Sequence, residues 1–278
     1  MFATEKLIKM ALEEDLGSGD VTTLSTVPPG TQAKALIKAK QDCVVAGIQV
    51  AGLVFRTLDP SLRLEAQATD GDRLQVGAPL MTISGEAVSI LMAERVALNF
   101  IQRLCGVATI TARFVAAIEG YAAEIVDTRK TTPGWRSLEK YAVQVGGARN
   151  HRHGLFDGIL IKDNHIRAAG SIAEAIGHAK RLAPHGLKIE VEAANLKQVQ
   201  EAVAVGADIV LLDNMEVSQL REAVAYVRSQ ASALKLEASG GVVLENVRQV
   251  AAAGVDFISV GALTHSAPAI DISLDLVS

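Results

Sequence analysis

The sequence has little of what marks several large protein classes. Only 4% of its 278 residues are aromatic, which leaves few side chains for stacking on bases, and a net charge of −4 excludes a generally basic nucleic-acid binder. The two cysteines, Cys43 and Cys105, lie far apart in unrelated contexts, so neither a disulfide framework nor a metal knuckle is indicated. These absences favour an enzyme or a small-molecule binder.

Long hydrophobic runs are also missing. The longest stretch without Asp, Glu, Lys or Arg runs from Phe257 to Ile270, which is 14 residues, and it contains His265 and Pro268. A membrane-spanning helix needs about 20 apolar residues. The first residues lack the basic start and apolar run of a secretory signal. We therefore expect a cytoplasmic protein with no membrane or nucleic-acid partner.

Hydrophobic patterning divides the chain into two parts. The first part combines helical patterns at residues 7–12 and 87–118 with β-type runs at 33–39, 44–48 and 62–66 and a hairpin between the glycine turns at 71 and 77. In the second part, short apolar strands alternate with alanine-rich helical segments, which is typical of a parallel βα sheet. We predict an incomplete βα-barrel with strands at 124–128, 158–162, 188–192, 208–213, 235–239 and 257–261.

Two of the predicted strands carry charge on one face. Residues 188–192 read Lys-Ile-Glu-Val-Glu, so the charged side chains share one face and the apolar ones share the other, and residues 235–239 repeat this pattern. The outer face of a barrel is covered by helices and must be apolar. The polar face is therefore predicted to line the barrel interior, and half-exposed antiparallel strands are the alternative.

Basic residues gather between residues 127 and 167. This segment holds eight basic and four acidic residues, a net charge of +4, so the rest of the chain carries −8. A basic pocket concentrates small anions, and arginine pairs bidentately with carboxylates and phosphates. The densest stretch, Asp127 to Arg136, follows a predicted strand and includes Arg129 and Lys130, which could hold two different anionic groups. A solvated basic loop is the alternative.

Further polar residues follow the predicted strands. Lys162 is either a Schiff-base nucleophile or a cation for a ligand, and its position alone does not decide. The carboxylates of Glu190, Glu192 and Asp213 could hold Mg²⁺ together with phosphate oxygens, or form an ion pair inside the barrel. Small residues after the last two strands suit a phosphate cradle, namely Ser239, Gly240, Gly241, Ser259, Gly261 and Ala262.

Several motifs together resemble the quinolinate phosphoribosyltransferase family. The longest are Glu14–Thr23, Glu94–Asn99, Asp127–Gly134, Asn150–Arg152 and Ile161–His165. The match continues in order through Glu190–Glu192, Leu211–Asn214, Glu237–Gly241 and Ser259–Leu263, so it covers almost the whole chain. The long motifs are specific, whereas the glycine pairs are not.

The resemblance implies a fold and a reaction. The fold is α/β, of the type II phosphoribosyltransferase kind: an N-terminal α/β sandwich at residues 1–110, with the tail 266–278 returning to it, and an incomplete six- or seven-stranded βα-barrel at 111–265. The reaction joins quinolinate to phosphoribosyl pyrophosphate with loss of carbon dioxide, giving nicotinate mononucleotide for NAD synthesis. The resemblance also implies Mg²⁺, no organic cofactor, and a homodimer with shared active sites that could assemble into hexamers.

The resemblance further implies a role for each matching residue. Arg129, Arg152 and Lys162, with Arg95 from the partner subunit, would bind the quinolinate carboxylates, and His151 would position the ring. Lys130 would contact phosphoribosyl pyrophosphate, and Glu192 and Asp213 would face the ribose and Mg²⁺. The 5′-phosphate would lie against the loops of Ser239, Gly240 and Gly241 and of Ser259, Gly261 and Ala262. Lys130, Lys162, Glu192 and Asp213 are thus the expected catalytic residues.

Three other functions compete with this one. A paralogue of the same architecture, associated with molybdenum transport, would share the barrel but is not expected to carry all four cationic positions. A Schiff-base lyase would use Lys162 covalently. A phosphate-sensing protein would bind the same ligands without turnover.

Overall fold

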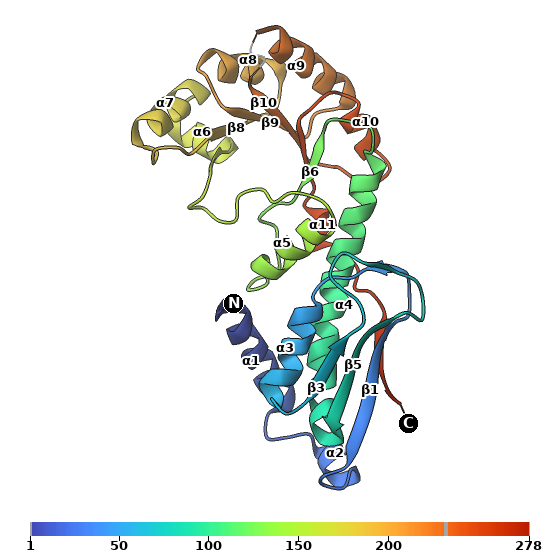
Figure 1. Cartoon of the computed structure of the whole chain (residues 1–278). Coiled ribbons are helices and arrows are strands. Elements are labelled where there is room, and N and C mark those ends of the chain that lie inside the picture. The colour runs from blue at the N-terminus through green and yellow to red at the C-terminus, as the bar shows by residue number, and fades with distance from the viewer. Residues whose placement is uncertain (1, 231–232, 278) are drawn as a thin grey trace. The chain divides into compact units, whose positions relative to one another are not determined.

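The computed structural model describes residues 2–230 and 233–277 and contains two compact units (Figure 1). The first unit comprises residues up to 112, residues 132–147 and the chain from 266 onward; the second comprises residues 113–131 and 148–265. The expected division after residues 110 and 265 lies close to two of these bounds. It differs at residues 132–147, which were expected in the barrel domain and pack with the first unit.

The first unit is built around a four-stranded antiparallel sheet. Strand β1 pairs with both β12 and β5, and β5 pairs with β3, in the order β12-β1-β5-β3. Their bounds are β1 (Gln32–Ala39), β3 (Arg63–Ala66), β5 (Pro79–Glu86) and β12 (Ile272–Val277). Strand β1 buries Ala35, Ile37 and Ala39 in alternation, as expected when one face of a sheet is covered. The pairing with β12 ties the end of the chain to this unit.

Helices α1 (Phe2–Leu16), α2 (Val21–Thr26), α3 (Ile48–Leu58) and α5 (Arg136–Val145) belong to the same unit, as does most of α4 (Ala87–Ala117). Among the described residues, α4 is the one helix long and apolar enough to cross a membrane by length and composition. However, 56% of its most apolar window is buried within the structure. Burial of this kind is typical of a core helix.

The prediction for residues 44–48 was only partly right. Strand β2 (Cys43–Val44) is short and pairs with β4 (Arg73–Leu74), whereas Ile48 begins helix α3. The Asp70 carboxylate accepts hydrogen bonds from the backbone N–H groups of Gly47 and Ile48, each at 3.0 Å, and so satisfies the helix N-terminus. The capping residue lies more than twenty positions away, so local patterning could not find it. The expected hairpin between the glycine turns at 71 and 77 is wrong, because β4 pairs with the distant strand β2 and not with a neighbouring strand.

The second unit is a six-stranded parallel sheet. The strands are ordered β6-β11-β10-β9-β8-β7, and all six lie where the hydrophobic pattern predicted them. Their bounds are β6 (Glu124–Val126), β7 (Ile159–Ile161), β8 (Ile189–Ala193), β9 (Ile209–Asp213), β10 (Lys235–Ser239) and β11 (Phe257–Ser259). Strands β6 and β7 stand at opposite edges, so the barrel is incomplete, as expected.

Helices follow the strands of this sheet along the chain. They are α6 (Asp163–Ala169), α7 (Ile172–Leu182), α8 (Leu196–Ala204), α9 (Val217–Gln230), α10 (Val247–Ala251) and α11 (Ala262–His265). In Figure 1, α7, α8 and α9 lie on the outer side of the strands. Because all six strands are parallel, their carboxyl ends meet at one end of the barrel, where the loops after the strands are brought together.

Part of the open edge beside β6 is covered by residues 149–151. The Arg149 N–H donates to the Ile125 carbonyl at 3.0 Å, and the Asp127 N–H donates to the Arg149 carbonyl at 3.2 Å. The fully buried Asp127 carboxylate accepts a hydrogen bond from the His151 N–H at 2.8 Å. These bonds fix the backbone of His151 and Arg152 beside the end of β6.

Candidate active site

A cavity of about 490 Å³ lies at the carboxyl ends of the barrel strands, entirely within the second unit. It combines basic, acidic and small residues from five of the six strands and the loops beside them. Its lining includes ten of the predicted site residues: Arg129, Lys130, His151, Arg152, Lys162, Asp213, Ser239, Gly240, Gly241 and Ser259.

The basic side chains crowd one another around this cavity. Arg152 is half-buried, and burial, together with the like charge of Arg129, holds the pKa of its guanidinium below the usual value. Lys130 follows Arg129, and its loop is held by the Thr264 hydroxyl, which donates to the Lys130 carbonyl at 2.8 Å. An anion bound between these cations would relieve their repulsion, which is the property of an anion-binding site.

Lys162 lies directly after β7 and faces a carboxylate. Its Nζ is 3.5 Å from Glu192 Oε2. Burial, and then the charge of Asp213, raise the pKa of Glu192 above its usual value, against the opposing effect of Lys162. An ion pair with a carboxylate suits a lysine that acts as a positive charge toward its partners, whereas a Schiff-base lysine must be neutral to attack. The pair therefore favours Lys162 as a cation.

Glycine turns form another wall of the cavity. Gly240 and Gly241 follow β10 with φ of 94° and 62°, a left-handed conformation that glycine adopts without strain and that is typical of anion-binding turns. A Cβ on Gly240 would overlap the Asn214 side chain, so the turn is packed tightly against the loop after β9. Gly241 has no neighbour within 4 Å of a built Cβ, which leaves its backbone open to a ligand.

A buried cluster forms the floor of the cavity. His151 Nε2 lies 3.1 Å from Glu190 Oε2 and 3.5 Å from Glu237 Oε2, and the two carboxyl side chains are almost fully buried. Burial alone would lower the pKa of His151, but the hydrogen bond to Glu190 and the charges of both glutamates raise it above its usual value. Burial, and then the Glu190 charge, raise the pKa of Glu237 to about 7.

The tautomer of His151 decides whether the cluster of His151, Glu190 and Glu237 suits a metal ion or a shared proton. Its Nδ1 lies 2.7 Å from the Arg152 N–H and accepts a hydrogen bond from it, so the ring proton of neutral His151 is on Nε2, between the carboxylates. The three facing atoms are close enough together for a metal ion. However, a ligating Nε2 must be unprotonated, which would place the ring proton on Nδ1, against the Arg152 N–H. The cluster is therefore built to share protons.

Glu192 and Asp213 are the better fit to Mg²⁺. They are close enough for the Asp213 charge to raise the Glu192 pKa, and both offer hard oxygen ligands. Mg²⁺ is commonly held by one or two carboxylates, with substrate phosphate and water completing the shell. Two carboxylates beside this cavity match the protein part of that description.

Some predicted residues lie outside the lining of the cavity. Glu192 contacts it only through Lys162. Gly261 packs against it, since a Cβ there would lie 3.1 Å from Lys130 Cδ, and Ala262 begins the adjacent helix α11. Arg95 lies on α4 in the first unit, with its side chain exposed. Its expected role toward a partner subunit stays a prediction.

Sequence reasoning assigned no role to Glu237 and did not place Asn214 at the site. A signal for Glu237 was present, because the alternation in residues 235–239 predicted that its side chain faces the barrel interior, and the structure buries it there. Asn214 carries no comparable signal. Its φ of 53° is the one positive value of a non-glycine residue in the described chain, and it reflects the packing against Gly240.

The basic segment 127–167 is divided between the two units. Residues after Thr131 turn into the first unit, where Glu139 is fully buried and pairs with Arg103 at 2.8 Å. The Trp135 ring stacks on Phe100 with centroids 4.5 Å apart. The stretch from Asp127 to Arg136 is therefore divided as well: Arg129 and Lys130 line the barrel cavity, whereas residues from 132 onward lie in the first unit.

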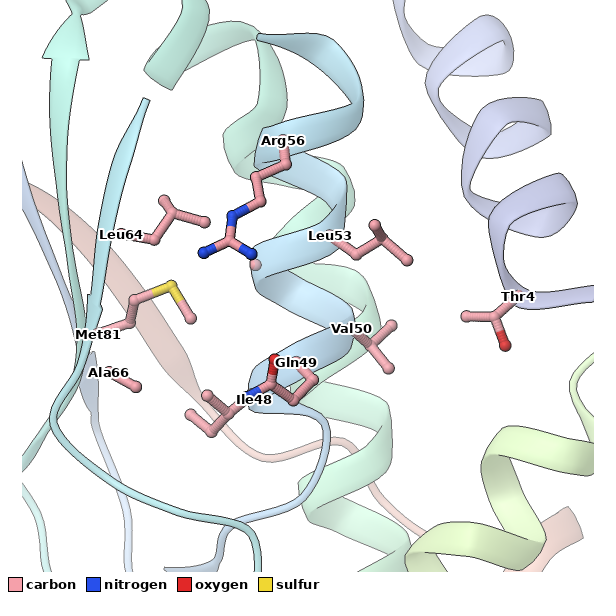
Figure 2. A pocket seen from close by; sticks show the side chains of 10 residues that line it. Thr4, Ile48, Gln49, Val50, Leu53, Arg56, Leu64, Ala66 and Met81 are labelled. Carbon is pink, nitrogen blue, oxygen red and sulfur yellow. The ribbon is translucent and has the colours of Figure 1, made fainter. Parts of the chain in front are cut away.

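A cavity of about 330 Å³ in the first unit is different in character (Figure 2). Its lining is mainly apolar, and Arg56 is the one charged residue among the described residues that line it, with its guanidinium near Leu64 and Met81. The described residues that line it include no carboxylate, histidine or glycine turn that could carry out chemistry at a polyanionic ligand. The catalytic candidate is therefore the cavity in the barrel.

The barrel cavity combines crowded cations, carboxylates and open glycine turns at the carboxyl ends of parallel strands. This combination defines an enzyme that acts on a small polyanionic substrate. Two family models match the chain, Quinolinate phosphoribosyl transferase, N-terminal domain, at residues 20–105 and Quinolinate phosphoribosyl transferase, C-terminal domain, at residues 107–275. The chain belongs to the quinolinate phosphoribosyltransferase family, which confirms the resemblance drawn from its motifs.

Individual relatives agree with this assignment. The chain is 44% identical over 277 residues to the nicotinate-nucleotide pyrophosphorylase [carboxylating] of Mycobacterium leprae, covering 99% of this chain and 97% of that protein. It is 43% identical over 268 residues to the probable enzyme of the same name from Synechocystis, with coverage of 96% and 90%. The solved nicotinate-nucleotide pyrophosphorylase of Francisella tularensis superposes with a TM-score of 0.94 at 39% identity, covering 99% of this chain and 96% of that one.

Proposed function

We propose that this chain transfers the phosphoribosyl group of phosphoribosyl pyrophosphate to quinolinate with loss of carbon dioxide. The products are nicotinate mononucleotide and pyrophosphate, and the reaction belongs to de novo NAD synthesis. The observation that carries the proposal is the crowding of Arg129, Lys130, Arg152 and Lys162 around one cavity. Four cations in one cavity suit a ligand pair with two carboxylates and several phosphates.

Three cations of the cavity would bind quinolinate. Arg129 and Arg152 would pair with the two ring carboxylates through charge-assisted hydrogen bonds, and Lys162 would add a third positive charge. His151 is held by hydrogen bonds at Nδ1 and Nε2, so its ring is a fixed surface against which the pyridine is positioned. A dianion is favoured over a monoanion because binding one carboxylate would leave part of the cation repulsion in place.

The remaining residues of the site would bind phosphoribosyl pyrophosphate. Lys130 would neutralise the pyrophosphate, while Glu192 and Asp213 would face the ribose. The 5′-phosphate would lie on the backbone N–H groups of the loops at Ser239, Gly240 and Gly241 and at Ser259, Gly261 and Ala262. Mg²⁺, held by Glu192 and Asp213, would neutralise charge on the departing pyrophosphate. No organic cofactor is required.

The arrangement of charge suits both chemical steps. Departure of pyrophosphate develops positive charge at the sugar C1, which the nearby carboxylates of Glu192 and Asp213 stabilise. The pyridine nitrogen then bonds to C1 and becomes cationic. A cationic ring accepts the electron pair released when the adjacent carboxylate leaves as carbon dioxide. The site thus uses position and charge, and no covalent enzyme intermediate is needed.

Turnover of the two substrates tests this function directly. The protein is incubated with quinolinate, phosphoribosyl pyrophosphate and Mg²⁺, and nicotinate mononucleotide, pyrophosphate and carbon dioxide are measured. We expect the three products in equal amounts, and nicotinate offered in place of quinolinate should give none. Binding of both substrates without any product would reject the enzyme in favour of a binding protein, and borohydride trapping of substrate on Lys162 would favour a Schiff-base lyase.

We also propose a homodimer with shared active sites, in which Arg95 of each subunit serves the cavity of its neighbour, and which could assemble into hexamers in the cytoplasm. The exposed Arg95 side chain on α4 supports this proposal. Inactive Arg95→Ala and Lys162→Ala subunits, mixed in equal amounts, should regain about one quarter of the wild-type activity, because half of the dimers are mixed and each has one intact site. No recovery despite proven subunit exchange would reject shared sites.

A further inference from the structure

Two cavities of the barrel share a wall formed by the buried cluster. Besides the substrate cavity, a cavity of about 420 Å³ lies toward the amino ends of the strands, where Ile159, Ile209 and Phe257 begin β7, β9 and β11. His151, Arg152 and Glu237 line both cavities. The second cavity also includes the exposed residues Arg149 and Lys188, so it reaches the surface. The cluster therefore separates the substrate from a second route to solvent.

Glu237 has an unusual position in this wall. Its side chain is 3% exposed, yet its Oε1 has no hydrogen-bond partner among the described residues, and its Oε2 lies 3.5 Å from His151 Nε2. A buried carboxylate oxygen without a partner is costly when it is charged, and much less so when the group is protonated. Burial without a partner for Oε1 thus favours neutral Glu237 over the charged carboxylate.

Binding of a dicarboxylate also favours the neutral form of Glu237. A site that attracts a dicarboxylate with Arg129 and Arg152 would be opposed by a negative charge on its own floor. A protonated Glu237 removes this repulsion. Because Glu237 lines both cavities, its carboxyl group can meet the substrate on one side and water on the other, while Glu190 holds the His151 ring beside it at 3.1 Å.

The proposed reaction requires a proton at this place. When carbon dioxide leaves, its electron pair stays on the ring carbon next to the pyridinium nitrogen, and a proton must replace the carboxylate there. We propose that Glu237 is the acid that protonates this carbon, and that water of the second cavity, which Glu237 also lines, supplies the replacement proton. The inference rests on the proposed function and adds a catalytic residue to it.

The step balances. The carbon–carboxylate bond breaks with its electron pair left on the ring carbon, and that pair takes the proton of the Glu237 carboxyl group, forming a carbon–hydrogen bond. Glu237 is left as a carboxylate. It regains a proton from water of the second cavity, which Glu237 itself lines, so the net donor is solvent and no oxidant or reductant takes part.

The surroundings of Glu237 set its pH dependence. Burial and the Glu190 charge on β8 raise its pKa to about 7, against the opposing effects of His151, of the Ser259 hydroxyl on β11 and of Lys162 after β7. On β9, the residue paired with Glu237 is the apolar Leu211. The acid is therefore present below about pH 7 and is lost as the pH rises through that value.

Glu237→Gln tests the assignment because it keeps the size of the side chain and its neutrality but removes the acidic proton. Quinolinate labelled with ¹⁴C in the carboxylate next to nitrogen is reacted in a single turnover, and pyrophosphate and ¹⁴CO₂ are timed separately. We expect pyrophosphate release within about threefold of wild type, while conversion to nicotinate mononucleotide slows about 100-fold, the usual scale of general acid catalysis. Glu245→Gln, an exposed glutamate, is the matched control and should leave both rates unchanged.

Two further readouts separate catalysis from structure. The wild-type rate of nicotinate mononucleotide formation should fall as the pH rises through about 7, and Glu237→Gln should lack this decrease. Glu237→Asp retains the acid and should keep the decrease, with an intermediate rate; it decides the matter if the glutamine variant does not fold. The inference is overturned if Glu237→Gln forms nicotinate mononucleotide at the wild-type rate, or if both variants lose pyrophosphate release in parallel. A wild-type protein that forms no products refutes the proposed function instead.

Discussion

The two ends of the barrel use charged residues in opposite ways. At the amino end, the Asp256 carboxylate accepts hydrogen bonds from Arg228 at 2.7 Å, from Lys235 at 2.8 Å and from the Leu236 N–H at 2.9 Å. At the carboxyl end, Arg129, Arg152 and Lys162 line one cavity, where the ion pair of Lys162 spans 3.5 Å. Charges at the first end satisfy one another, and those at the second are gathered around open space.

This difference separates structural charges from functional ones. A carboxylate with all its partners in place gains stability and has nothing left to offer a ligand. Cations that repel one another lower the stability of the fold. Their presence in one cavity is explained by an anionic ligand, because its binding removes the repulsion. Variants at the carboxyl end should therefore change activity, and variants at the amino end should change stability.

The largest effect on the use of quinolinate as a substrate is expected for Arg152→Ala. Loss of its charge-assisted hydrogen bonds, about 1.5–3 kcal/mol, should lower kcat/KM for quinolinate about 10- to 100-fold while the melting temperature changes little. Arg149→Ala is the control, because this neighbouring arginine pairs with Glu124 at 2.8 Å and does not line the substrate cavity. Steady-state kinetics and thermal melts of both variants make the comparison. Equal losses of stability and activity in Arg152→Ala would give it a structural role.

A smaller effect is expected from Gly240→Ala. The φ of 94° is strained for alanine at a cost of about 1–2 kcal/mol, and the new Cβ would displace the Asn214 side chain and the phosphate loop. Gly186→Ala, with a similar φ of 91° and no neighbour within 4 Å, carries the backbone strain alone. We expect Gly240→Ala to raise the KM for phosphoribosyl pyrophosphate severalfold, whereas Gly186→Ala leaves it unchanged. An unchanged KM in both would remove this loop from the phosphate site.

The smallest effect is expected at the amino end, from Asp256→Asn. Burial alone would raise the pKa of Asp256, but hydrogen bonds from Lys235 and Arg228 outweigh it and hold the pKa below its usual value. A lowered folded-state pKa gives stability that is present above the unfolded pKa and is lost as the pH falls through the folded one. The variant should lose about 1 kcal/mol or less at pH 7, as for partly exposed ion pairs, and the difference should shrink below about pH 4.

Asp213→Asn at the opposite end is the counterpart of that variant. Its stability at pH 7 should match wild type within about 0.5 kcal/mol, as for most substitutions away from a packed core, while its activity is lost. Chemical denaturation at pH 7 and pH 3.5 measures both variants. A destabilised Asp213→Asn beside an unchanged Asp256→Asn would reverse the distinction between the two ends.

Much of the barrel could be predicted because its information is local. Each strand is a short apolar run between turn signals, so all six were found from sequence. The alternation around Glu190 and Glu237 also predicted their inward direction, and the structure buries both. Cations after strands were expected at the carboxyl end for the same reason, since parallel strands bring their following loops together.

The remaining features depend on contacts between distant residues. Helix α3 begins where Asp70 caps it, and the Glu139 side chain draws its segment into the first unit through Arg103. Neither partner is visible in the local pattern. The proton-sharing cluster likewise requires His151, Glu190 and Glu237 to meet across three parts of the barrel, and the distances that define it exist only in the folded chain.

The proposed function requires the barrel cavity to bind the dicarboxylate on its crowded cations. The most direct test is a crystal structure of the protein with quinolinate bound. We predict that both carboxylates lie within hydrogen-bond distance of Arg129, Arg152 or Lys162 in the cavity of about 490 Å³, with the ring against His151. Quinolinate bound elsewhere, without contact to any of these three side chains, would contradict the proposed role of the barrel cavity.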